Sequence, residues 1–117
     1  KSDGTVVVTS NNGSKYYNEN GECDVTSWTD IVAISAADNH VIGLKSDGTV
    51  VSTKYIGKYT YHGQDAVSEW TNIVAISAGD FRSVGLKADG TVITTKYIGE
   101  EKDYKGQCDV QNWNLFD

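Results

Sequence analysis

The sequence predicts an all-β protein built from β-propeller blades, because three features of the chain agree. Thr, Val, Ile, Tyr and Gly dominate, and no apolar set repeats at helical spacing over three turns. Several motifs recur about every 42 residues, the length of a propeller blade of about four antiparallel strands. Apolar residues also occupy both faces of the expected strands. We therefore expect an incomplete propeller of about 2.5 to 3 blades, with a plain antiparallel sandwich as the alternative.

The internal repeat is carried by blocks that keep one period. Residues 28–36, WTDIVAISA, return 42 positions later as residues 70–78, WTNIVAISA. Residues 43–50, GLKSDGTV, return at the same offset as residues 85–92, GLKADGTV. The start of the chain, KSDGTV, is a further partial copy of the second block. A shared period in separate blocks indicates one structural unit used repeatedly.

A third series of blocks precedes each Trp and sets the repeat boundaries. Each block begins with Gly and ends with Val, at residues 21–25, 63–67 and 106–110. They lead to Trp28, Trp70 and Trp113. The chain is thus predicted to be a single repeat domain, 1–117. It divides into a partial blade, two repeats and the start of another: 1–20, 21–62, 63–105 and 106–117.

Four strands are expected within one period. Residues 31–35 and 41–44 form β-branched runs, and Ser46-Asp47-Gly48 supplies a turn in which Gly tolerates a positive φ and Asp caps the backbone. Residues 49–53 form the third strand, and a looser fourth strand is expected near residues 64–67.

The first of these strands carries apolar residues on both faces. Val32 and Ile34 are expected to face one way, and Ile31 and Ala33 the other. The strands of a sheet with one solvent-exposed face would alternate strictly between apolar and polar residues. The pattern therefore predicts that both faces are covered, as when one blade is stacked between two others.

Charge and hydropathy exclude some partners. The net charge is −6 and the pI about 4.7, whereas binding to phosphate groups needs a basic face, so no nucleic-acid partner is expected. No apolar run approaches the roughly 18 residues of a membrane span. The first residues lack the apolar core of a signal peptide, although a processed chain is compatible with this start. An extracellular or cell-surface location is favoured.

No metal, cofactor or catalytic site is predicted. The two cysteines, Cys23 and Cys108, are expected to be separate, partly buried thiols, and with only His40 and His62 they are too few for a zinc site. His40 stands at the head of a strand and is interpreted as structural. Three aspartates precede Gly in the repeated turn and are interpreted as turn residues: Asp3, Asp47 and Asp89.

The candidate binding residues are aromatic and lie in the variable segment of each repeat. All seven tyrosines fall between the Thr-Val strand and the next Gly-Gln or Gly-Glu, among several lysines and one histidine. Tyr is enriched in recognition surfaces because it offers a large contact area at low entropy cost. Packing of these rings against neighbouring blades is the alternative. The predicted ligand-binding residues are Tyr16, Tyr17, Tyr55, Tyr59, Tyr61, His62, Tyr97 and Tyr104.

The repeated blocks resemble a known family. The pattern of Ile-Ser-Ala-Gly, four variable residues, Val-Gly-Leu-Lys-x-Asp-Gly-Thr-Val and then Gly-Gln-Cys and Trp is similar to the repeat of the regulator-of-chromosome-condensation family, especially its bacterial versions. The best matches are residues 34–50 and 76–92. The family often has His at the position of His40, where the second repeat has Arg82. The resemblance implies a β-propeller, commonly seven-bladed.

The resemblance also suggests what such a chain does. The eukaryotic namesake acts on a small GTPase and on chromatin, but this acidic chain lacks the basic surface that chromatin requires. Bacterial relatives include a secreted β-lactamase inhibitor that binds through loops on one propeller face. We therefore expect a non-enzymatic module that binds a protein through propeller loops. The alternatives are a glycan-binding cell-surface domain and a purely structural segment of a larger extracellular repeat protein.

The number of repeats predicts association. About 2.8 periods fit into 117 residues, whereas propellers have about 4–8 blades. An open stack would expose apolar sheet faces that favour association. We therefore expect either a fragment of a longer propeller or a homo-oligomer.

Overall fold

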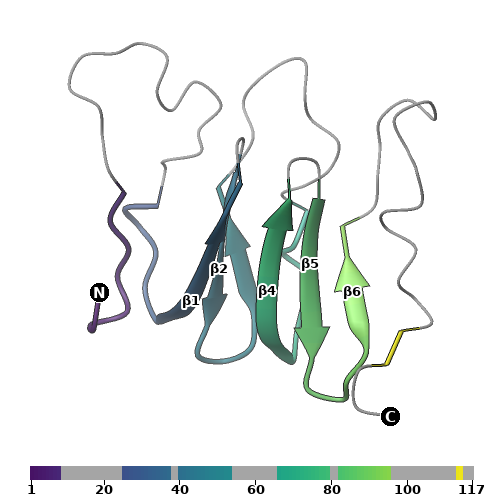
Figure 1. The fold of residues 1–117 in the computed structure, drawn as a ribbon. Helices are drawn as coiled ribbons and strands as arrows, with labels where there is room; N and C mark the ends of the chain where they lie inside the picture. Colours follow the sequence, from purple (N-terminus) through teal and green to yellow (C-terminus); the bar gives the residue numbers. More distant parts are fainter. Residues whose placement is uncertain (9–24, 38–39, 54–65, 80–81, 96–112, 115–117) are drawn as a thin grey trace, which may run out of the picture.

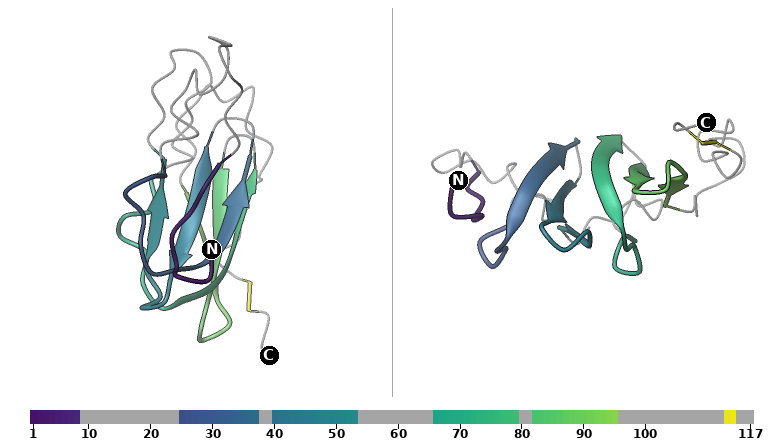
Figure 2. Two further views of the ribbon diagram at one scale, coloured as in Figure 1. Left: turned by 90° about the vertical axis from the view of Figure 1, so that its left-hand side faces the viewer. Right: turned by 90° about the horizontal axis from the view of Figure 1, so that it is seen from below.

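The protein is all-β in the part of the chain that the structure describes. The computed structural model describes residues 1–8, 25–37, 40–53, 66–79, 82–95 and 113–114. Their strands form two separate antiparallel sheets of three strands each, and none of these residues lies in a helix (Figure 1). The all-β prediction is confirmed at this level. The two sheets lie side by side and do not close on themselves (Figure 2).

Each sheet is a meander whose strand order follows the sequence. The first sheet contains β1 (Ile31–Ala36), β2 (Val41–Lys45) and β3 (Val50–Ser52). The second sheet contains β4 (Ile73–Gly79), β5 (Arg82–Lys87) and β6 (Val92–Thr94). These strands lie where the first three strands of each period were predicted, within two residues at every end.

The described residues test only the end of the predicted fourth strand. Ala66 and Val67 lie outside any strand, and Gln64 and Asp65 are outside the described residues. The Val67 carbonyl instead accepts a hydrogen bond from Trp70 N at 3.0 Å, and Val25 and Trp28 make the same turn at 3.1 Å. This turn places the Trp ring against its sheet. The valine carbonyl is therefore hydrogen-bonded within the turn and not to a neighbouring strand.

The two sheets have the same register at the 42-residue offset. Ile31 pairs with Lys45 and Ile73 pairs with Lys87, and both first strands carry a β-bulge directly after this pair. The residues before the two strands, Asp30 and Asn72, both have a positive φ, near 60°. Asn and Asp are the side chains that best tolerate this conformation, which explains why the position alternates between them.

The bulge corrects the predicted faces of β1. The sequence places Ile31 and Ile34 on opposite faces because it assumes strict alternation. In the structure, Ile34 pairs with Gly43, and a Cβ on Gly43 would lie 3.1 Å from Ile31 Cδ1, so both isoleucines are on the same face as Gly43. The extra residue of the bulge reverses the alternation between them.

The hairpin turns are formed as predicted. Gly48 has φ +84° and Gly90 has φ +88°, the left-handed region that favours glycine. The turn of the first sheet also meets the second sheet, because Ile73 N donates to the Gly48 carbonyl at 2.9 Å. Gly4 repeats this contact one unit earlier, where its carbonyl accepts from Ile31 N at 3.0 Å.

The main core lies between the two sheets, where β4 packs against β1 and β2. We call the face of each sheet that carries Trp28 or Trp70 its front face, and the opposite face its back face. The back face of the first sheet meets the front face of the second. The buried members of this core are Ile42, Leu44, Val50, Val67, Trp70 and Ile73, with Ile76, Ala78 and Ile93 partly buried against them.

A smaller cluster covers part of the front face of the first sheet. Val25, Trp28 and Val41 are buried there, and the N-terminal residues Val6 and Val8 pack against them. Val6 therefore occupies, relative to Trp28, the place that Val50 occupies relative to Trp70. The N-terminal segment acts as the third strand of a preceding unit without being paired as a strand.

The prediction that both faces of β1 are covered is wrong. Val32 and Ile34 are 64% and 55% exposed, and most of β1 is exposed with them. Residues 1–8 supply only one strand-like segment, which leaves the rest of the front face open. At the other end of the stack, Trp113 is 54% exposed, although Trp28 and Trp70 are buried.

Candidate functional site

The eight predicted site residues all lie outside the described residues. They fall in three segments, 9–24, 54–65 and 96–112, and the structure therefore does not test whether they come together. The structure does describe the residues that flank these segments. Those flanking residues define where the segments leave the sheets and where they return.

A buried threonine stands at the start of two of the three segments. Thr53 and Thr95 are each 2% exposed and follow directly after the third strand of their sheet. Thr53 Oγ1 accepts a hydrogen bond from Val41 N at 3.0 Å, and Thr53 N donates to the Val41 carbonyl at 3.0 Å. Thr95 makes the same two bonds with Ser83. Backbone and side chain together thus fix the point at which each segment begins.

A buried valine and tryptophan stand where a segment ends. Val67 follows the segment 54–65, and Val25 follows the segment 9–24; both are buried, as are Trp28 and Trp70 three residues later. The short turn between valine and tryptophan repeats at both places. The segments are therefore held at repeat-equivalent positions where these flanks are described.

The starting points lie at one edge of the stack, by which we mean the end of the strands that is opposite to the Asp-Gly turns. Thr53 and Thr95 pair with the first residues of the middle strands or their immediate neighbours, opposite to the Asp-Gly turns (Figure 1). The connection between β1 and β2 lies at the same edge, where Ala37 N donates to the His40 carbonyl at 2.9 Å. This edge is the candidate binding edge of the molecule.

The opposite edge carries the three repeated aspartates. In each turn the aspartate Oδ1 accepts from the hydroxyl of the Thr two residues later at 2.6 Å and from its backbone N at 2.9–3.0 Å. These hydrogen bonds, the hydroxyl one first, lower the pKa of each carboxyl from its ordinary value. The acceptor oxygen is engaged in the turn, as predicted for Asp3, Asp47 and Asp89.

His40 is part of the contact between the sheets. It is fully buried, and its Nε2 lies 2.8 Å from Ser83 Oγ of the second sheet. Ser35 makes a second polar contact across the same junction, because its Oγ accepts from Ala78 N at 2.9 Å. The structural interpretation of His40 agrees with this geometry. The sequence gives one signal for this partner, because Ser83 stands where the first repeat has the apolar Val41.

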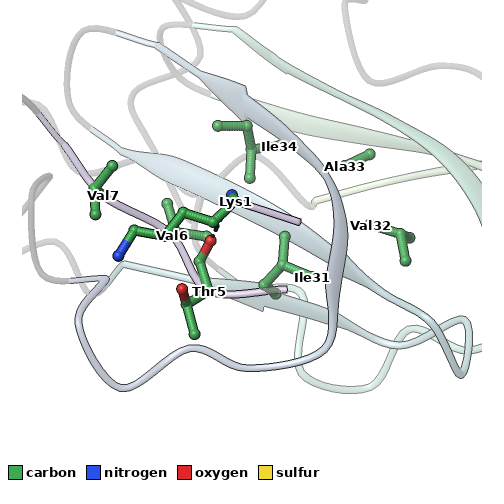
Figure 3. A pocket seen from close by; sticks show the side chains of 8 residues that line it. All are labelled: Lys1, Thr5, Val6, Val7, Ile31, Val32, Ala33 and Ile34. Carbon is green, nitrogen blue, oxygen red and sulfur yellow. Dashed lines mark hydrogen bonds between the residues drawn. The ribbon is translucent and has the colours of Figure 1, made fainter. Parts of the chain in front are cut away.

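A shallow hollow of about 210 Å³ lies between the N-terminal segment and β1 (Figure 3). Its lining is mainly aliphatic, with Lys1 and Thr5 at one side, where the Lys1 amino terminus donates to the Thr5 carbonyl at 2.9 Å. Val7, Val32 and Ile34 line it and are themselves exposed. The hollow offers apolar contact area and no acid–base pair, so it is suited to packing rather than to chemistry.

The described residues offer no metal site. No group of three His, Cys, Asp or Glu side chains comes together among them. Cys23, Cys108 and His62 are outside the described ranges, so the prediction of separate thiols is not tested. Likewise, none of the described segments is a helix that could cross a bilayer.

Comparison with known proteins leaves the function to be argued from the chain itself, because no protein-family model and no curated protein matches the sequence. The resemblance of the repeated blocks to the regulator-of-chromosome-condensation family therefore stays a prediction. Its best matches are residues 34–50 and 76–92, and the similarity extends over essentially the whole chain.

Proposed function

We propose that the chain is a non-enzymatic protein-binding module that presents tyrosine-bearing segments from one edge of a stack of propeller blades. The three segments are 9–24, 54–65 and 96–112. In this proposal each three-stranded sheet is the described part of one blade of the regulator-of-chromosome-condensation type, and the tyrosines supply the contact area. Recognition then resembles that of other proteins in which a rigid scaffold carries variable loops.

The observation that supports this proposal most is the paired hydrogen bonding of Thr53 and Thr95. A loop that binds a partner loses less entropy when its ends are already fixed. Both threonines are buried and hold the backbone at equivalent points of the two sheets. The repeat keeps these starting points and the next four residues constant, KYIG at 54–57 and at 96–99, and the segments differ only beyond them, which is the division expected between scaffold and recognition segment.

The composition of the segments supports a protein partner. Tyrosine rings bury a large area and offer a hydroxyl for hydrogen bonding, and they are enriched at protein interfaces. Lysines stand among them in an otherwise acidic chain: Lys15, Lys58, Lys102 and Lys105. The three segments carry eight acidic residues against six lysines, so the tyrosine rings and not a net positive charge would supply the contact with a partner.

The test compares capture of secreted and surface proteins by three immobilised chains. The first is the wild type, and the second carries Tyr59→Ala, Tyr61→Ala and Tyr104→Ala. The third carries Val32→Ala and Val74→Ala, two exposed apolar residues on the strands that serve as the matched control. A partner captured by the wild type is then measured by titration.

We expect the tyrosine variant to bind at least tenfold more weakly, which corresponds to about 1.4 kcal/mol, while the control binds as the wild type does. Retained affinity in the tyrosine variant would overturn the proposal. A glycan array with the same chains examines the alternative of carbohydrate binding. Glycan binding that is lost in the tyrosine variant, with no protein partner captured, would replace the protein by a glycan as the ligand class.

A further inference from the structure

We propose that two copies of this chain associate front to back, with the second sheet of one copy packed against the first sheet of another. The surface that receives the incoming copy is the open front face of β1, here called the front flank, with Ile31, Ile34 and Ala36. The surface that docks is the back face of the second sheet, here called the back flank, with Val84, Leu86 and Val92. This proposal does not depend on the proposed binding edge.

The junction within the chain is the template for this association. There the back face of the first sheet, with Ile42, Leu44 and Val50, packs against the front face of the second. The contacting side chains of the second sheet include Ile73, Ile76 and Ala78. Every one of these positions has a counterpart 42 residues away that stands on one of the two flanks.

The front flank has the side chains of the covered face and lacks its cover. Ile73 is 3% exposed, whereas its counterpart Ile31 is half-buried. Ile76 is half-buried, whereas its counterpart Ile34 is 55% exposed. Ala36 is exposed, although its counterpart Ala78 is half-buried. The residue types are identical, so the difference comes from the missing neighbour and not from the sequence.

The back flank shows the same relation in the opposite direction. Ile42, Leu44 and Val50 are buried beneath the second sheet, whereas their counterparts Val84, Leu86 and Val92 are only half-buried. Two of the three pairs are identical residues, and the third exchanges Ile for Val. The two flanks are thus the two complementary halves of an interface that the chain already forms once.

Part of the polar contact is also available at the flanks. Within the chain, Ser35 Oγ accepts from Ala78 N at 2.9 Å. Their counterparts are Ser77 on the second sheet and Ala36 on the first, and both are exposed. The contact between His40 and Ser83 has no counterpart, because Arg82 and Val41 stand at those positions. We therefore expect the junction between copies to be weaker than the junction within one.

The N-terminal segment competes with the incoming copy. Val6 and Val8 pack on the front face of the first sheet, where the template requires the third strand of the incoming sheet, β6. Residues 1–8 leave the hollow beside β1, which is the part of the front face that they do not fill (Figure 3). Docking therefore displaces residues 1–8. Weakening their packing with Val6→Ala and Val8→Ala should strengthen the association several-fold.

A front-to-back contact joins two different surfaces, so the occupant must carry the back flank. A second copy satisfies this condition with side chains that are seen to fit at the equivalent junction. Repetition of such a contact either closes into a ring or continues as a filament.

The test uses two variants that each block one flank. Ile34→Asp places a charge on the front flank, and Leu86→Asp places one on the back flank. The matched control is Val74→Asp, because Val74 is exposed and apolar but belongs to neither flank. Each full-length chain is checked for folding by circular dichroism, and its mass is measured by sedimentation velocity over a range of concentrations. Val92→Lys replaces Leu86→Asp if the latter fails to fold.

We expect the wild type and the control to associate at micromolar concentration, and each blocked variant to associate at least tenfold more weakly. An equal mixture of the two blocked variants should form one-to-one dimers, because one variant keeps the back flank and the other keeps the front flank. A monomeric wild type at about 100 µM would overturn the proposal. Self-association of either blocked variant with the affinity of the wild type, loss of association in the control, or failure of the mixture to dimerise would do the same.

Discussion

Trp70 and Gly85 show how single residues hold a sheet together. The Trp70 ring lies so close to Gly85 that a Cβ there would be 3.0 Å from Cζ3, and Trp28 has the same relation to Gly43. Both rings are buried, so neither can move aside without disturbing the core. The glycine is needed because the ring occupies the space of its side chain.

Gly85→Ala is therefore expected to lower the free energy of unfolding by about 1–3 kcal/mol, the usual cost of overpacking a tight core. Gly79→Ala is the control, since a Cβ there would be 3.6 Å from the nearest atom, Arg82 Cγ. Urea unfolding followed by Trp fluorescence measures both. Equal effects of the two substitutions would show that the contact with Trp70 does not constrain the sheet.

The aspartate turns predict how stability depends on pH. Because their hydrogen bonds lower the pKa of Asp47 and Asp89 in the folded chain, the stabilisation is complete above the ordinary Asp pKa of about 3.9 and is lost as the pH falls through the lowered value. Asp47→Asn with Asp89→Asn keeps the acceptor oxygen and removes the titration. Urea unfolding between pH 2 and 7 should show a shallower acid loss in the variant, and an unchanged profile would contradict this role.

At the scale of elements, the end of each third strand is fixed by a threonine hydroxyl. Thr95 Oγ1 accepts from Ser83 N at 3.0 Å in a buried position, and Thr53 does the same with Val41. This bond continues the strand pairing beyond β6 by one residue through a side chain. It thereby sets the point from which segment 96–112 leaves the sheet.

Thr95→Val keeps the shape of the side chain and removes this acceptor. We expect the free energy of unfolding to fall by about 1–3 kcal/mol, the cost of leaving a buried donor unsatisfied. Thr95→Ser, which keeps the hydroxyl, should fall by clearly less. Thermal unfolding of the two variants gives the comparison, and a Val variant as stable as the Ser variant would show that the hydroxyl is dispensable.

The strands and hairpin turns could be predicted because they depend on nearby residues. Features that depend on tertiary contacts could not be predicted. The Asp47-Gly48 turn depends on nearby atoms only, so the sequence predicted it correctly. The bulge in β1 and the turn at Val67 depend on how Trp28 and Trp70 reach their sheets. No short-range pattern encodes that distance, which is why the faces of Ile31 and Ile34 were predicted wrongly and Val67 was expected to lie in a strand.

For the candidate site, only the positions at which the variable segments start and end could be predicted from the sequence. The 42-residue period marks where each variable segment starts and ends, and the described flanks agree with it at Thr53 and Val67. The predicted tyrosines follow from composition, whereas their arrangement depends on loop conformations that no period sets. The hydroxyls of Ser35 and Ser83 were missed because polar residues within an apolar strand are read as ordinary surface positions.

At the scale of the whole molecule, the chain is a stack of equivalent sheets that meet front to back. Ile76 is half-buried in the second sheet and its counterpart Ile34 is 55% exposed in the first, because only the second sheet has a neighbouring sheet on its front face. The isolated bridge between Thr91 and Asn114 continues the stacking order of the repeats beyond the second sheet. Stability is therefore shared between sheets as in other repeat proteins, where each unit depends on its neighbours.

The most direct test of this account is a methyl-resolved NMR experiment on the full chain. The front-to-back stack predicts nuclear Overhauser contacts from the Leu44 methyls of the first sheet to Val67 and Ile73 of the second. At concentrations where the chain is monomeric, it predicts no contact from Ile34 to the second sheet. Contacts from Leu44 within its own sheet only, or contacts from Ile34 to Ile76 in a monomer, would contradict the stacking.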